Sequence, residues 1–474
     1  MDANNIKEKI QFVINKCKEE DIYLNIMADF FKQGITKTSN YLKSLKILPH
    51  KSERALKETF ENNIKIIITS IENGIKPGLI IYNVLSCIYG SFYGNTLGAF
   101  YMLSKNSKDN QKKLYKIPYF NGEKGQATND YEIAMSLAYA IMDNPSKESL
   151  DPNYLYFYYG AWSTSNPLKI ESSIKSALSK FNFIQFHPIK SNFKYIENEI
   201  SNNNKNSLSN RFLMRKSTFI IWTFYRFYGE INIAFNEISD NKPLLNLYLK
   251  IKNLSHIDNI CTHPNPSTDI VSSFYCIMVL GILYGLRAKN ILHKIECLCE
   301  DEYFKNKGDE NEKNFSNFFL SNFNNINSRN FEFSKFFGDN TSKNCVNNND
   351  IGWYGHAFLL IIYYLINYDN YESESGFIDI MNEICNLGGD TEGNCCIVGG
   401  IIGPIFGMSN FGKHFFNSLE SISPKRYIYS IALMVPYIIY LKKSNKDIKL
   451  IQNEHYFLQT ILTLLYDKIE LDFS

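Results

Sequence analysis

Apolar residues recur at helical spacing along most of this chain, and this periodicity restricts it to helix-on-helix packing. In the first half, helices are predicted over residues 132–142, 167–181, 216–227 and 269–291. In the second half, they are predicted over residues 353–366, 378–384, 394–405, 427–441 and 454–466. No series of short alternating segments with regular turns is present, so little β-sheet is expected. The sequence therefore predicts an all-α fold.

The 474 residues divide into one main domain with attached segments. Residues 1–78 are predicted to form a helical N-terminal extension that packs on the main domain, with a separate interaction module as the alternative. The main domain is predicted over residues 79–440, followed by a C-terminal helical segment over residues 441–474. Residues 301–349 are of low complexity and are expected to form a partly ordered insertion. Four phenylalanines are expected to anchor this insertion to the surface: Phe315, Phe318, Phe319 and Phe323.

The charge balance and the apolar stretches exclude several classes of protein. With 50 basic and 48 acidic residues the net charge is +2, so neither direct nucleic-acid binding nor membrane attachment is expected. The apolar stretch over residues 270–286 is shorter than the roughly 20 residues of a membrane span, and a buried helix is expected there. The first residues lack a signal-like apolar core, and the ten cysteines lack zinc-finger spacing. We therefore expect an intracellular protein in the cytoplasm.

The most informative segment is residues 386–407, in which paired glycines precede Asp390, Thr391 and Glu392 and a helix of small residues follows. Two carboxylates two positions apart in a turn can face one point, which suits a divalent cation that prefers oxygen ligands. The N-terminus of the following helix would stabilise their negative charge. The alternative is an ordinary helix start, with Asp390 as the N-cap after a tight glycine turn. Both interpretations stay open at this point.

A second acidic segment lies at residues 127–132, directly before a predicted helix. It contains Thr128, Asn129 and Asp130, followed by Glu132. Thr or Asn at the N-cap with acidic residues in the first turn is also what an ordinary helix start looks like. By itself, this segment therefore favours the structural interpretation.

Five motifs follow one another in order: residues 90–99 (GSFYGNTLGA), 128–131 (TNDY), 209–215 (SNRFLMR), 262–263 (TH) and 388–392 (GGDTE). They resemble the motifs GDALGA, TDDT, SNGxLMR, TH and GGDTD of the ADP-ribosylglycohydrolases. This all-helical family of hydrolases includes dinitrogenase-reductase-activating glycohydrolase and the ADP-ribosylarginine and ADP-ribosylserine hydrolases. Each motif is short, but their common order between residues 80 and 440 makes the resemblance specific.

The resemblance implies a helical bundle that holds Mg²⁺ or Mn²⁺ and binds ADP-ribose or an ADP-ribosylated protein. It also implies hydrolysis of the bond at the anomeric carbon of the ribose. By position in the motifs, the metal ligands would be Thr128, Asn129, Asp130, Asp390 and Glu392, and the last three would be the catalytic carboxylates. Bound divalent ions orient the ribose hydroxyls and activate a water molecule, and a nearby carboxylate accepts its proton.

Ligand-binding residues follow from the same resemblance. Ser207 and Asn210 would meet the diphosphate. Arg211, which replaces a small residue of the family motif, would either contact the diphosphate as a forked donor or fill the groove. His263 would line the nucleoside side of the site, although a lone histidine in a helical protein is also commonly a core residue.

Several positions depart from the family motifs. Asn129 replaces an acidic residue, and the loss of a unit charge at about 4 Å is worth roughly 4 kcal/mol at an effective dielectric constant near 20. Glu392 is longer than the aspartate of the family, Gly393 replaces a hydroxyl residue, and Asn95 replaces an aspartate. We therefore expect fewer than two ions to bind firmly.

Three hypotheses result from these observations. The first is a divalent-metal-dependent hydrolase of ADP-ribosyl linkages, based on the three carboxylates that remain. The second is a catalytically impaired relative, a pseudoenzyme that binds ADP-ribose or protein partners, based on the departures. The third is an interaction protein that acts through residues 1–78 and 301–349.

Overall fold

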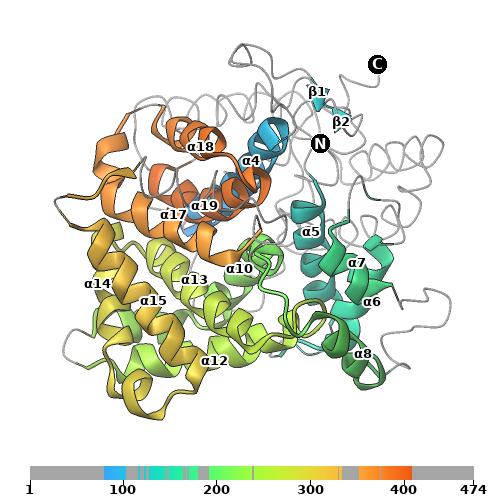
Figure 1. The fold of residues 1–474 in the computed structure, drawn as a ribbon. Coiled ribbons are helices and arrows are strands. Elements are labelled where there is room, and N and C mark those ends of the chain that lie inside the picture. The colour runs from blue at the N-terminus through green and yellow to red at the C-terminus, as the bar shows by residue number, and fades with distance from the viewer. Residues whose placement is uncertain are drawn as a thin grey trace, which may run out of the picture.

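The structure is a computed structural model, and it consists almost entirely of helices (Figure 1). It describes residues 80–102, 116–117, 122–123 and, with short gaps, 128–407, the longest of these gaps being 180–191 and 334–351. The expected N-terminal extension, the C-terminal segment and the helices predicted over 427–441 and 454–466 lie outside the described residues. The domain boundaries therefore stay predictions.

The helices follow one another with short connections. The first are α4 (Ile80–Met102), α5 (Asn129–Asp143), α6 (Pro152–Ser163), α7 (Ser172–Leu178), α8 (Lys194–Asn204), α9 (Arg211–Met214), α10 (Lys216–Arg226), α11 (Tyr228–Asn236) and α12 (Lys242–Asn259). After them come α13 (Pro266–Tyr284), α14 (Ala288–Cys299), the π-helix η2 (Tyr303–Lys307), α15 (Glu310–Ile326), α17 (Tyr354–Asn367), the 3-10 helix η4 (Tyr368–Tyr371), α18 (Gly376–Leu387) and α19 (Thr391–Phe406). The strands β1 (Lys116–Ile117) and β2 (Gly122–Glu123) form one antiparallel pair, with Lys116 opposite Glu123. The all-α prediction is confirmed.

The helix predicted over residues 269–291 is in fact two helices. Helix α13 ends at Tyr284, where Gly285 adopts a φ of 107° that favours glycine. The amide of Leu286 then donates to the carbonyl of Gly281 at 2.9 Å, which closes the helix end. Periodicity alone did not show this break, because the apolar pattern continues into α14.

Helix α13 runs through the interior of the protein. Among the described residues it is the one helix that is long and apolar enough to cross a membrane by length and composition, and 89% of its most apolar window is buried in the protein. The buried helix predicted over residues 270–286 is therefore confirmed. Helices α10, α12, α14 and α15 pack around it.

The described part of the segment expected as an insertion, residues 301–328, is helical. Its helix α15 begins with a capping box, in which Asp309 and Glu312 bond to each other's backbone amides. Helix α15 packs on α13, α14 and α17. Three of the four phenylalanines expected to anchor this segment are buried, and the fourth is partly buried against the same core: Phe315, Phe319, Phe323 and Phe318.

Helices α4 and α19, which come from opposite ends of the described chain, lie against each other (Figure 1). The contact is close because α4 presents Gly90, Gly94 and Gly98 at a spacing of four residues. A Cβ at any of these positions would overlap a backbone carbonyl oxygen of α19. This packing places the first turn of α19, with Asp390 and Glu392, beside the C-terminal half of α4.

A buried ion network joins the start of α10 to the end of α12. Asp258 accepts hydrogen bonds from Arg215 at 3.0 Å and from Lys216, and all three side chains have no exposed surface. Burial alone would raise the pKa of Asp258, but Arg215 and Lys216 lower it to about 2. The network therefore holds a charged carboxylate inside the core, next to the loop that carries the 209–215 motif.

Candidate functional site

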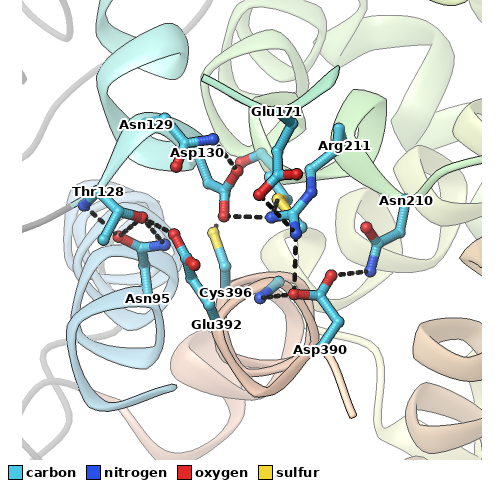
Figure 2. A network of polar contacts seen from close by, with 12 residues as sticks. Asn95, Thr128, Asn129, Asp130, Glu171, Asn210, Arg211, Asp390, Glu392 and Cys396 are labelled. Carbon is cyan, nitrogen blue, oxygen red and sulfur yellow. Dashed lines mark hydrogen bonds and ion pairs between the residues drawn. The ribbon is translucent and has the colours of Figure 1, made fainter. Parts of the chain in front are cut away.

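Four helix N-termini bring their polar residues to one buried point (Figure 2). Asp130 lies in the first turn of α5, Asp390 is the N-cap of α19, Arg211 begins α9, and Glu171 is the N-cap of α7. Because the N-terminus of a helix carries partial positive charge, carboxylates are stabilised there. We call Asp130, Glu171, Asp390, Glu392 and Arg211 the acidic cluster.

The guanidinium group of Arg211 lies at the centre of this cluster, between carboxylates from three other helices (Figure 2). Its Nη1 donates to Asp130 Oδ2 at 2.7 Å, and its Nη2 donates to Asp390 Oδ1 at 3.0 Å. Nη2 also lies 3.3 Å from Glu171 Oε1. The sequence gave Arg211 a role at the diphosphate or in filling the groove. The observed position differs from diphosphate binding, since both terminal nitrogens are directed at carboxylates.

Burial decides the electrostatics of the cluster. Asp130, Asp390 and Glu392 are each only 1% exposed, whereas the side chain of Glu171 is 22% exposed. Burial raises the pKa of Asp130 well above its usual range although Arg211 acts in the opposite direction, and the neighbouring carboxylates add to the rise. Burial alone would lower the pKa of Arg211, but the carboxylates around it keep that pKa high. Arg211 therefore remains a cation.

Asp390 satisfies both interpretations of its segment. It follows two glycines with positive φ, Gly388 at 77° and Gly389 at 71°, so it sits after a tight turn, and its side chain caps the amide of Gly393. Its Oδ2 also accepts a hydrogen bond from Asn210 Nδ2 at 2.9 Å, while Oδ1 faces Arg211. The aspartate is thus an N-cap and a member of the cluster at the same time.

Thr128 and Glu392 meet on the other side of Asp130. Thr128 is the N-cap of α5, yet its side chain does not cap the helix. Its hydroxyl instead contacts Glu392 Oε1 and accepts a hydrogen bond from Asn95 Nδ2 at 3.0 Å. Asn95 Oδ1 in turn accepts from the Thr128 amide at 2.8 Å, so Asn95 positions Thr128 and does not itself face the cluster centre. A threonine that gives up its capping bond in this way is oriented by the site.

Asn129 offers one oxygen for a further ligand. Its Nδ2 donates to Asp130 Oδ1 at 2.9 Å, whereas its buried Oδ1 has no hydrogen-bond partner among the described residues. Together with Thr128, Asp130 and Glu392 it provides two carboxylates, an amide oxygen and a hydroxyl, which are suitable donors for one hard cation.

A centre with two ions does not fit these residues. The space between Asp130 and Asp390 is taken by the guanidinium of Arg211. Within residues 80–102 and the described parts of 128–407, no three His, Cys, Asp or Glu side chains are arranged to hold a metal ion. The five expected ligands are therefore divided by Arg211, with Asp390 on the far side from the other four.

Two of the predicted ligand-binding residues lie away from these contacts. Ser207 is half-buried in the loop between α8 and α9, where its amide donates to the carbonyl of Asn204. His263 is fully buried, with Nδ1 3.0 Å from Thr262 Oγ1 and its ring beside Phe212. Burial lowers the pKa of His263 well below its usual value. This environment is that of a neutral core histidine.

Sequence reasoning missed two residues of the site. Glu171 was assigned to the interior of a helix predicted over residues 167–181, but α7 begins only at Ser172, so Glu171 is free to turn inward as its N-cap. Gly352 lies beside Asn210, whose amide donates to the Gly352 carbonyl at 2.6 Å. Neither residue belongs to a motif, so the acidic character of Glu171 was the one available signal.

The geometry can now be compared with known proteins. The model of the ADP-ribosylglycohydrolase family matches residues 80–442, a range that contains every residue of the acidic cluster. The chain belongs to this family. A protein of Acanthamoeba polyphaga mimivirus, L543, provisionally named an ADP-ribosyl glycohydrolase, is 24% identical over 347 residues, which cover 71% of this chain and 88% of the viral protein. The sequence-based family assignment is thus confirmed.

Solved structures show a more distant likeness. A chain described as an ADP-ribosylglycohydrolase-related protein complex aligns with a TM-score of 0.44 and 12% identity, over 76% of this chain and 97% of that chain. The family match is the finding that bears on activity. Because the family is one of glycohydrolases, membership supports a hydrolase of ADP-ribosyl linkages in general terms.

Proposed function

We propose that this protein hydrolyses the bond at the anomeric carbon of ADP-ribose, in an ADP-ribosylated protein or an ADP-ribose derivative. One observation carries the proposal: the fold brings Asp130 and Asp390, 260 positions apart (390 − 130), to the same guanidinium group in a chain of a glycohydrolase family. A purely structural Asp N-cap would need no such partner from a distant motif.

The chemistry of the cluster is consistent with hydrolysis at an anomeric carbon. Positive charge develops on the sugar as the bond to the leaving group breaks, in an oxocarbenium-like transition state. Four carboxyl groups surround one guanidinium, so the cluster has excess negative charge to stabilise that centre. Glu392, oriented by the Thr128 hydroxyl, would accept the proton of the attacking water, and the leaving group would take up a proton in turn.

One divalent ion would add to this chemistry. Thr128, Asn129, Asp130 and Glu392 would hold a single Mg²⁺ or Mn²⁺, which would supply Lewis-acid chemistry when bound. Of the predicted ligand-binding residues, Asn210 contacts the cluster through Asp390, and Ser207 stands on the same loop. We keep both as candidates for the diphosphate side of ADP-ribose.

A second candidate function is binding of ADP-ribose without turnover. It is favoured by the position of Arg211, which engages two of the three carboxylates assigned to catalysis. Calorimetry with ADP-ribose, with and without Mg²⁺, distinguishes the two candidates. Ligand binding that tightens with Mg²⁺ favours the hydrolase, and ligand binding that is indifferent to Mg²⁺ favours the binding protein.

The decisive experiment measures release of free ADP-ribose. The full chain is incubated in millimolar Mg²⁺ with ADP-ribosylated arginine, ADP-ribosylated serine and O-acetyl-ADP-ribose, and the product is separated by chromatography. We expect release from at least one substrate, and loss of release in Glu392→Gln. The control is Glu230→Gln, because that carboxylate pairs with Lys250 at the protein surface and should leave the rate unchanged. A folded chain that binds ADP-ribose but releases none from any substrate would contradict the hydrolase.

A further inference from the structure

We infer that Arg211 is a built-in cation of this site, whose guanidinium replaces a divalent ion between Asp130 and Asp390. The inference concerns the site of the proposed function and rests on that assignment, but its test measures ion binding and not turnover. It therefore can fail or succeed independently of hydrolysis.

The first argument is spatial. Nη1 and Nη2 of one guanidinium lie 2.7 and 3.0 Å from the two carboxylates that face each other. A Mg²⁺ or Ca²⁺ ion binds carboxylate oxygens at about 2.0–2.6 Å, so an ion that bridged these carboxylates would occupy the volume of the guanidinium itself. The guanidinium and a bridging ion are mutually exclusive.

The second argument concerns how firmly Arg211 is held. Its side chain is only 6% exposed and touches a third carboxylate, Glu171, and the sulfur of Met214 at 3.4 Å. Helix α9 lies directly on the start of α19 at Gly393, where a Cβ would overlap the end of Met214 and lie 2.5 Å from Asp390 Oδ2. Glycine at position 393 thus lets α9 approach closely enough for Arg211 to reach both aspartates.

The third argument is charge balance. Without the guanidinium, two buried carboxylates would face each other with no compensating charge, and such a pair must take up a proton or a cation. A small residue at position 211 would therefore open a vacant, negatively charged position of suitable size for a divalent ion. Arginine satisfies the same requirement permanently and without metal.

The test is the number of Mn²⁺ ions bound per chain, measured from the spin-resonance signal of free Mn²⁺ during a titration. We expect the parent to bind no more than one ion. Arg211→Gly should bind one ion more than the parent, and its melting temperature should rise more on addition of Mn²⁺. Arg211→Lys keeps the cation and should bind the same number of ions as the parent.

Two results would overturn the inference: a parent chain that binds two ions, or a folded Arg211→Gly chain that gains none. If Arg211→Gly does not fold, Arg211→Gln takes its place, because it keeps bulk and hydrogen bonding while removing the charge, and it too should gain one ion. The parent stoichiometry decides in either case. A chain that hydrolyses no substrate but shows this pattern would contradict the proposed function and support the built-in cation.

Discussion

The hydroxyl of Thr391 donates a hydrogen bond to the carbonyl oxygen of Gly98 at 2.7 Å, and this bond fastens the first turn of α19 to α4. Glu392 is the next residue, so the position of a cluster carboxylate depends on how closely the two helices approach. The absence of a side chain at position 98 permits this approach. The glycines of the 90–99 motif therefore act on the site through packing.

Gly98→Ala should destabilise the protein and displace Glu392. The added Cβ would overlap the Thr391 carbonyl oxygen and lie 2.7 Å from the Cα of Glu392, so the helices must separate. Overpacking of this kind typically costs about 1–3 kcal/mol, and we expect a lower melting temperature together with weaker Mn²⁺ binding. The control is Gly229→Ala in α11, where a Cβ meets nothing within 4 Å. There, stability should stay level or rise by up to about 1 kcal/mol, because alanine is the better helix former. Equal effects of the two substitutions would contradict the packing argument.

Asn129→Asp should tighten binding of the single ion without changing the number of ions. The substitution places a charge where the buried Asn129 Oδ1 has no partner among the described residues, while Arg211 still fills the space between Asp130 and Asp390. A full charge at about 4 Å corresponds to roughly 4 kcal/mol at an effective dielectric constant near 20, before solvent and protonation reduce it. Calorimetric titration with Mn²⁺ gives both the affinity and the stoichiometry. An unchanged affinity would remove Asn129 from the ligand set.

The sequence predicted much of this site because its motifs lie at helix starts. Asp130 and Asp390 could be paired in advance through the family resemblance, and the fold places both at Arg211. Composition could not show where the Arg211 side chain would point, since the direction depends on the approach of α9 to α19. Glu171 escaped detection for a related reason: its inward direction follows from the true start of α7, and apolar periodicity defines helix ends poorly.

The same limit explains the error at residues 269–291. Apolar spacing continues across Gly285, so periodicity predicts one helix, whereas a local left-handed conformation ends α13 there. Helix interiors were predicted well because burial imposes the 3.6-residue period on them. Helix ends are set by single residues and their hydrogen bonds, and these become visible only when the partners are in place.

Asp258→Asn should be strongly destabilising. The substitution leaves the guanidinium of Arg215 and the ammonium of Lys216 in the core without their carboxylate, and breaking such a buried pair costs about 3–5 kcal/mol. Urea denaturation at pH 7 measures the change. Asp369→Asn is the matched control, because Asp369 and its partner Lys289 are 45% and 62% exposed and such surface pairs contribute at most about 1 kcal/mol. Similar losses in both variants would show that the Asp258 network is not specifically stabilising.

The contribution of Asp258 should disappear in acid. Its pKa is about 2 in the folded protein against 3.8 as the ordinary value, so the folded state favours the ionised form. Stability from this group is complete above pH 3.8 and is lost as the pH falls through about 2, to the extent of about 2 kcal/mol. The difference in unfolding free energy between the parent and Asp258→Asn should therefore narrow between pH 4 and pH 2. A difference that stays constant over this range would contradict the assignment.

Asp390→Asn tests the catalytic role of the cluster most directly. The substitution removes one charge beside Arg211 and presents an amide group to Asn210 Nδ2, which donates to Asp390 Oδ2 in the parent. We expect the release of ADP-ribose to fall by about 100-fold or more, because removing one preorganised electrostatic partner from an active site has effects of about 10²–10³-fold. The melting temperature should fall moderately, since the asparagine can still cap α19. Circular dichroism confirms that the helices remain, and ADP-ribose calorimetry separates weaker binding from slower chemistry. Asn210→Ala, which leaves the carboxylate in place, is the companion variant and should lose much less activity. If Asp390→Asn keeps the rate of the parent, Asp390 serves as a helix cap and as a partner for Arg211, and the chemistry must belong to other residues.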